Sequence, residues 1–178
     1  MKFSISQKKQ EAEITRLFRD TFSDSEGVEE GKMIGSLAND LMTMTDNNDL
    51  VIFVAMDEEK LIGSVIFTTF SLEDKTKAFL LSPMAISTSY QGNGIGQALI
   101  QHGLNTLKEQ GVELLVTYGD PSFYSKVGFQ QISEDVIKAP LKLSYPHGWL
   151  GQSLTSDEIS PIQGASECVE ALNKQEYW

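Results

Sequence analysis

The chain has 178 residues, of which 40% are hydrophobic and 22% charged, a composition typical of a soluble globular protein with one domain. Its formal net charge of −11 argues against nucleic-acid binding, which requires clustered Lys and Arg. No apolar run approaches the roughly 20 residues that cross a bilayer, and the N-terminus lacks the apolar stretch of a signal peptide. Because Cys168 is the single cysteine, no internal disulfide can form, and we expect a cytoplasmic protein with no membrane contact. With only two histidines in addition, we expect no metal site.

The first third of the chain predicts a short strand and two amphipathic helices. Residues 3–6 alternate between apolar and polar, and Ser6 is a candidate N-cap for the helix that follows. A polar loop is expected at 23–27. Apolar side chains recur at helical spacing on either side of this loop: Ile14, Leu17, Phe18 and Phe22, then Ile34, Leu37, Leu41 and Met44.

The centre of the chain predicts strands joined by turns and one helix. Apolar segments at 50–56, 61–70 and 78–86 are predicted to be strands, the first two forming a hairpin. A helix then runs to Gln110 and ends at Gly111, and the segment 112–118 is a further strand. A strand, a helix and a strand in this order indicate a parallel pair with a right-handed crossover. Beyond residue 130 we expect short strands interrupted by prolines, and the pattern is weak from 151 onward.

A glycine-rich loop joins the third predicted strand to this helix. Gly92, Gly94 and Gly96 alternate with other residues and lead directly into the helix. Glycines allow unusual backbone torsions and close ligand approach, and the first amides of a helix lack intrahelical partners. Together these features suit a phosphate group. The spacing matches neither a P-loop nor the dinucleotide fingerprint, and a turn that merely caps the helix explains the glycines equally well.

Two motifs resemble those of the GNAT N-acetyltransferases. The segment 91–96, Gln-Gly-Asn-Gly-Ile-Gly, is similar to the acetyl-CoA diphosphate loop of that family, with Asn93 where many relatives have a basic residue. The segment 119–129 is similar to the second hallmark, in which an aromatic residue and Tyr124 precede Gly128 and Phe129. Its Gly-Asp-Pro-x-Phe-Tyr wording resembles a branch of small bacterial proteins. The resemblance covers residues 3–129 of what we expect to be one domain, 1–178, with 130–178 as a C-terminal, acceptor-side region.

The resemblance implies the fold, the reaction and the site. The fold would be α/β (α+β), with a mixed, mostly antiparallel sheet, splayed central parallel strands and flanking helices. The enzyme would transfer an acetyl group from acetyl-CoA to a primary amine by direct attack, without a metal, acting on a small molecule or a protein as a monomer or homodimer. Tyr124 would be the general acid, and the Met84 backbone N–H would face the thioester oxygen. The cofactor would contact the backbone of Met84, Ala85, Ile86, Gln91, Gly92, Asn93, Gly94, Ile95 and Gly96.

Several alternatives remain open from the sequence. Tyr124 also suits an aromatic cluster with Phe123 and Phe129 under the sheet. No general base can be identified: Glu26, Glu29 and Glu30 suit solvated surface, His102 suits an exposed helical position, and His147 suits a turn. A CoA-binding module that senses without catalysis would need the glycine loop but no acid. A nucleotide-binding protein would use the same glycines.

Overall fold

A computed structural model describes all 178 residues, which form two compact units that alternate along the sequence. The first unit contains residues 1–67 and 83–103, and the second contains residues 68–82 and 104–178. Strands β3 (Lys60–Leu72) and β4 (Ala78–Ile86) and helix α3 (Ile95–Glu109) run from one unit into the other. None of the helices combines the length and the hydrophobicity that a membrane span requires.

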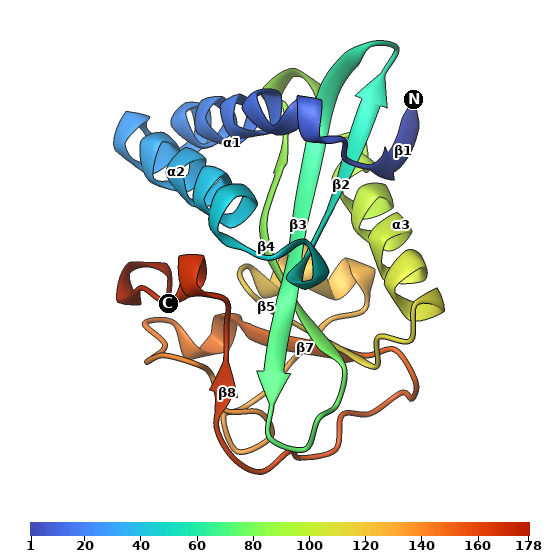
Figure 1. Cartoon of the computed structure of the whole chain (residues 1–178), viewed down its shortest axis with the longest axis vertical. Coiled ribbons are helices and arrows are strands. Elements are labelled where there is room, and N and C mark those ends of the chain that lie inside the picture. The colour runs from blue at the N-terminus through green and yellow to red at the C-terminus, as the bar shows by residue number, and fades with distance from the viewer. The chain divides into compact units, whose positions relative to one another are not determined.

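The first unit contains two long helices and antiparallel strands. Helix α1 (Glu11–Glu26) and helix α2 (Val28–Met44) pack side by side (Figure 1). Gly31 and Gly35 of α2 allow the close approach, because a Cβ at Gly35 would lie 2.9 Å from the Arg19 Cβ of α1. Strand β1 (Lys2–Ile5) pairs antiparallel with β2 (Leu50–Asp57). Phe53 of β2 meets Phe67 of β3 edge to face at 5.8 Å, so aromatic packing holds this part of the core.

The second unit contains the parallel pair. Strand β4 pairs in parallel with β5 (Leu114–Tyr118), which pairs antiparallel with β7 (Trp149–Ser153). Helix α4 (Pro121–Tyr124) follows β5, and the short strands β6 (Gln130–Gln131) and β8 (Ser166–Glu167) pair with β7 and β3. The strand order is β1-β2-β3-β4-β5-β7-β6, with β8 on β3. The prediction of a mixed, mostly antiparallel sheet with one parallel pair and flanking helices is therefore confirmed.

Three predictions about local structure are wrong. Ser6 does not cap α1: a 3-10 turn at Lys8–Gln10 intervenes, and Gln7 and Gln10 form its capping box. The expected loop at 23–27 is helical up to Glu26, and the break is confined to Gly27 (φ +100°). His102 is not exposed, because its ring packs against Phe3 (5.9 Å) and Phe53 (5.6 Å).

Candidate functional site

The glycine loop enters α3 with its first helical amides free of intrahelical partners. Gly92 and Gly94 have φ of +78° and +74°, a left-handed conformation that other residues rarely adopt. Helix α3 begins at Ile95, and the Ala98 N–H donates to the Gly94 carbonyl at 3.0 Å. The N–H groups of Ile95, Gly96 and Gln97 therefore precede the hydrogen-bond ladder of the helix. This arrangement suits an anionic group at the positive end of the helix dipole.

Side chains hold this loop in place without a cation at position 93. The Gln91 Nε2 donates to the Ile86 carbonyl at 2.9 Å, which ties the loop to the end of β4. The Asn93 Nδ2 donates to the carbonyls of Tyr90 and Gln91, both at 3.3 Å. The Gln91 N–H donates to the Thr88 carbonyl at 3.3 Å, so this predicted phosphate donor is already engaged within a 3-10 turn. The side chains of the loop thus fix its shape, and its later amides remain for a ligand.

The predicted pantetheine segment lies at the end of β4, directly before the loop. Ala85 and Ile86 are buried and Met84 is partly buried. The Ser87 N–H just beyond them donates to the Ile62 carbonyl of β3 at 2.8 Å. Because β3 occupies that edge of the strand, backbone groups of β4 that serve a ligand must do so from its other edge.

Tyr124 lies at the end of α4 in an aromatic cluster within the second unit. Asp120 caps this helix, since its carboxylate accepts from the Ser122 N–H at 2.9 Å. The Tyr124 ring meets Phe123 at 5.1 Å and Phe129 at 5.7 Å, both edge to face. It also lies against Gly119, where an added Cβ would come within 2.7 Å of the ring. The packing role that the sequence left open is therefore present, and it fixes the direction of the hydroxyl.

The Tyr124 hydroxyl lies at the last register pair of the two parallel strands. It hydrogen-bonds with Thr117, and the Thr117 Oγ1 donates to the Leu81 carbonyl of β4 at 2.9 Å. Leu81 and Thr117 form the last register pair of β4 and β5, yet β4 continues for five further residues to Ile86. β5 itself ends one residue later at Tyr118, so Tyr124 lies beside the last paired residues of the parallel strands, and the splay expected from the resemblance stays a prediction.

Burial raises the pKa of Tyr124 to about 12, the hydrogen bond with Thr117 partly offsetting this shift and nearby Asp120 adding to it. Desolvation disfavours the phenolate, which carries a charge, and leaves the phenol unaffected. The group is therefore a neutral hydrogen-bond donor at every physiological pH. It cannot serve as a base there.

The candidate acidic and imidazole groups occupy three different settings. Glu26 ends α1, and Glu29 and Glu30 begin α2, where Glu29 accepts from the Lys32 Nζ at 3.0 Å. Burial, and to a smaller extent Glu26, raises the pKa of Glu30. His147 lies exposed in a 3-10 turn, with its Nδ1 3.1 Å from the Gln131 Nε2. If that amide donates to Nδ1, the ring proton lies on Nε2, and neutral His147 then presents a donor there.

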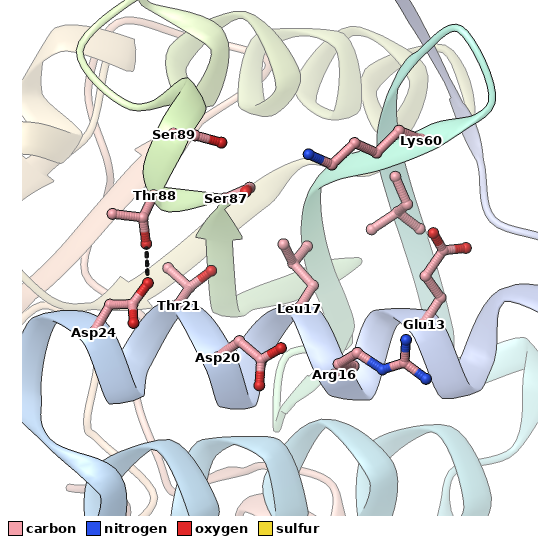
Figure 2. Close-up of a pocket in the computed structure, with 11 residues that line it drawn as sticks. Glu13, Arg16, Leu17, Asp20, Thr21, Asp24, Lys60, Ser87, Thr88 and Ser89 are labelled. Atoms are coloured by element: carbon pink, nitrogen blue, oxygen red, sulfur yellow. Dashed lines mark hydrogen bonds between the residues drawn. The ribbon is translucent and has the colours of Figure 1, made fainter.

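Sequence reasoning missed three parts of this arrangement. Thr117 is a buried hydroxyl within an otherwise apolar strand, and that contrast was the available signal. Gln97 supplies a third free amide, as the position of the helix start would have indicated. A cavity beside α1 is lined by three separate segments of the chain, which no local pattern could bring together (Figure 2).

Comparison with known proteins identifies the family. The sequence model of the "Acetyltransferase (GNAT) domain" matches residues 48–131. The chain is 30% identical over 122 residues to the uncharacterised N-acetyltransferase YhbS of Escherichia coli K12, covering 66% of this chain and 71% of YhbS. The family match at residues 48–131 includes both the glycine loop and the Tyr124 segment.

Solved structures share the fold. The crystal structure of Escherichia coli YhbS in complex with CoA has a TM-score of 0.84 at 24% identity and covers 98% of this chain and 92% of that one. A GNAT acetyltransferase from Brucella melitensis in complex with acetyl-CoA has a TM-score of 0.74 at 20% identity and covers 97% of both chains. Sequence and fold agree, and the chain belongs to the GNAT family of N-acetyltransferases.

Proposed function

We propose that this chain transfers an acetyl group from acetyl-CoA to a primary amine by direct attack within a ternary complex. The observation that carries the proposal is the row of free backbone N–H groups after Gly94, which can donate hydrogen bonds to a diphosphate without any basic side chain. YhbS and the Brucella protein were crystallised with CoA and acetyl-CoA, which supports the same ligand here. The Gly-Asp-Pro-x-Phe-Tyr segment supports placing the chain in a branch of small bacterial enzymes.

The main chain is proposed to bind the cofactor and to stabilise the oxyanion. The amides from Gly92 to Gln97 would hold the diphosphate, with Gln91 contributing shape through its bond to Ile86. The free edge of Met84, Ala85 and Ile86 would pair with the pantetheine arm. A Met84 N–H directed at the thioester oxygen would stabilise the developing charge, an effect worth about 3 kcal/mol per donor.

Tyr124 is proposed as the proton donor to the departing thiolate. Its packing against Phe123, Phe129 and Gly119 holds the hydroxyl beside Thr117, and its raised pKa keeps it protonated. The amine must be neutral before it attacks, and deprotonating a lysine-like ammonium at pH 7 costs about 4–5 kcal/mol. The acceptor, a small molecule or a protein, would release that proton to water or to a carboxylate.

The test is acetyl transfer to a panel of amines. Purified protein is incubated with acetyl-CoA and each amine, release of free CoA thiol is followed, and the acetylated product is identified by mass spectrometry. We expect at least one amine to raise thiol release above the hydrolysis background and to gain one acetyl group. Binding of CoA with no transfer to any amine would favour the sensor module instead. Failure to bind CoA at all would refute the diphosphate site.

A further inference from the structure

The first unit contains a cavity of about 420 Å³ that includes none of the proposed acetyl-CoA residues. One face of α1 forms its floor, and the start of β3 and the turn after β4 form its other walls. Its size lies within the range of small-molecule sites. The lining residues are Glu13, Arg16, Leu17, Asp20, Thr21, Asp24, Lys60, Leu61, Ser87, Thr88 and Ser89.

The lining combines unused charges of both signs over an apolar patch. Figure 2 shows Glu13 and Lys60 toward one end of the cavity and Asp24 with Thr88 at the other, with Leu17 between them. Leu17 and Leu61 are buried and supply the apolar surface. The two ion pairs of the structure join Arg19 to Asp20 and Lys32 to Glu29. Neither ion pair includes Glu13, Arg16 or Lys60.

The two remaining carboxylates each keep one oxygen for a ligand. Both bonds from Arg19 go to the Oδ1 of Asp20, at 2.8 and 2.9 Å, and leave its Oδ2. The Thr88 hydroxyl donates to the Oδ2 of Asp24 at 2.6 Å and leaves its Oδ1. Lys60 lies 5.1 Å from the centre of the Tyr90 ring, a cation–π contact that orients the ammonium without neutralising it.

We propose that this cavity binds a small molecule that carries both ammonium and carboxylate groups, with a basic α-amino acid as the best match. The lining residues carry three carboxylates and two cations, and Arg19, which lies outside the lining, pairs with Asp20, so the cavity presents charges of both signs that a ligand with ammonium and carboxylate groups complements. Arg16 and Lys60 would hold its carboxylate, because a guanidinium can donate two parallel bonds to that group. Glu13 and Asp20 would accept from the ammonium groups, and Leu17 would contact the aliphatic chain.

L-Lysine is the probe that tests this site, and isothermal titration calorimetry of the full chain without acetyl-CoA is the measurement. Omitting acetyl-CoA excludes turnover, so the result does not depend on the proposed acetyl transfer. Pentane-1,5-diamine and hexanoate are the comparison ligands, since the first lacks the carboxylate and the second lacks both amines. We expect saturable binding of L-lysine and at least about tenfold weaker binding of both comparison ligands.

Variants assign the binding to the cavity. Glu13→Gln and Arg16→Gln each remove one charge from exposed side chains and should weaken L-lysine binding by about tenfold or more. Glu11→Gln removes the same charge two residues before Glu13 on α1. Because Glu11 does not line the cavity, this variant should bind L-lysine with unchanged affinity. No saturable heat up to about 10 mM L-lysine would overturn the proposal. Equal affinity in both cavity variants, or equal affinity for the diamine, would also overturn it.

Discussion

Replacing Gly94 with Val tests the backbone basis of the proposed diphosphate site. Gly94 has φ of +74°, and a Cβ there would meet nothing within 4 Å. In the absence of ligand, the substitution is therefore unfavourable because of backbone strain and not because of a steric clash. An L-residue in this conformation costs about 1–2 kcal/mol, and a β-branched residue costs more. For a chain of this length we expect a fall in melting temperature of about 2–8 °C, at about 2–4 °C per kcal/mol.

The effect on CoA binding should be larger than the effect on stability. If the loop relaxes to negative φ, the amides turn away from the diphosphate, and each lost hydrogen bond to a charged group costs about 1.5–3 kcal/mol. We therefore expect CoA affinity, measured by calorimetry, to fall by about tenfold to a hundredfold or more. Acetyl transfer at a fixed low acetyl-CoA concentration should fall in parallel.

Gly111→Val provides the matched control. Gly111 ends the α3 region with φ of +83°, and a Cβ there also meets nothing within 4 Å. This variant should lose similar stability for the same backbone reason and bind CoA as the parent does. If Gly94→Val melts like Gly111→Val and binds CoA with unchanged affinity, then the conformation of Gly94 does not create the diphosphate site, and the reasoning fails.

Three further predictions concern Tyr124 and its surroundings. Tyr124→Phe should lower kcat by about tenfold or more with unchanged CoA affinity, and an unchanged kcat measured by thiol release would exclude its role as an acid. Because the folded-state pKa is raised to about 12, the stability that this group contributes is complete below about pH 10 and is lost as the pH rises toward 12. That loss amounts to about 2–3 kcal/mol, and urea unfolding between pH 9 and 12 should show it in the parent protein and not in Tyr124→Phe. Gly119→Ala places a Cβ within 2.7 Å of the Tyr124 ring. It should lower the free energy of unfolding in urea by about 1–3 kcal/mol and lower kcat by displacing the hydroxyl. Unchanged stability and kcat would show that the ring adjusts freely.

Strand and helix positions could be predicted wherever the chain carries a strong local pattern. The segment 78–86 was predicted as a strand with the bounds that the structure has, because its apolar run is continuous and turns flank it. The segment 23–27 was predicted as a loop because Ser, Asp and Gly favour turns. In the structure α1 continues to Glu26, since α2 packs closely on it through Gly31 and Gly35, and tertiary contact overrides the local preference.

The candidate site was more accessible to prediction in its main-chain part than in its side-chain part. The glycine loop is local in sequence, so its position before a helix and its resemblance to the GNAT diphosphate loop led to the prediction of an anion site, whereas the glycine spacing alone left a capping turn open. The Thr117 bond to Leu81 and the cavity beside α1 depend on segments distant along the chain, and a single sequence carries no measure of such proximity. The prediction that His102 is exposed failed for the same reason, because its partners Phe3 and Phe53 lie on other elements.

The high pKa of Tyr124 sets a condition on how it can protonate a leaving thiolate. Against a thiol with an ordinary pKa near 8.5, transfer from a phenol with a pKa of about 12 is uphill by about 5 kcal/mol, compared with about 2 kcal/mol for an unperturbed tyrosine. Burial that disfavours a phenolate also disfavours a thiolate, so a sulfur held in the same dry surroundings has a raised pKa as well. The difference between the pKa values of the phenol and the thiol then narrows toward its value in water, and the proton can move as the C–S bond breaks. The proposed role of Tyr124 therefore requires a sulfur that shares its buried environment, and excluding water from the surroundings of its hydroxyl would be part of the catalytic requirement.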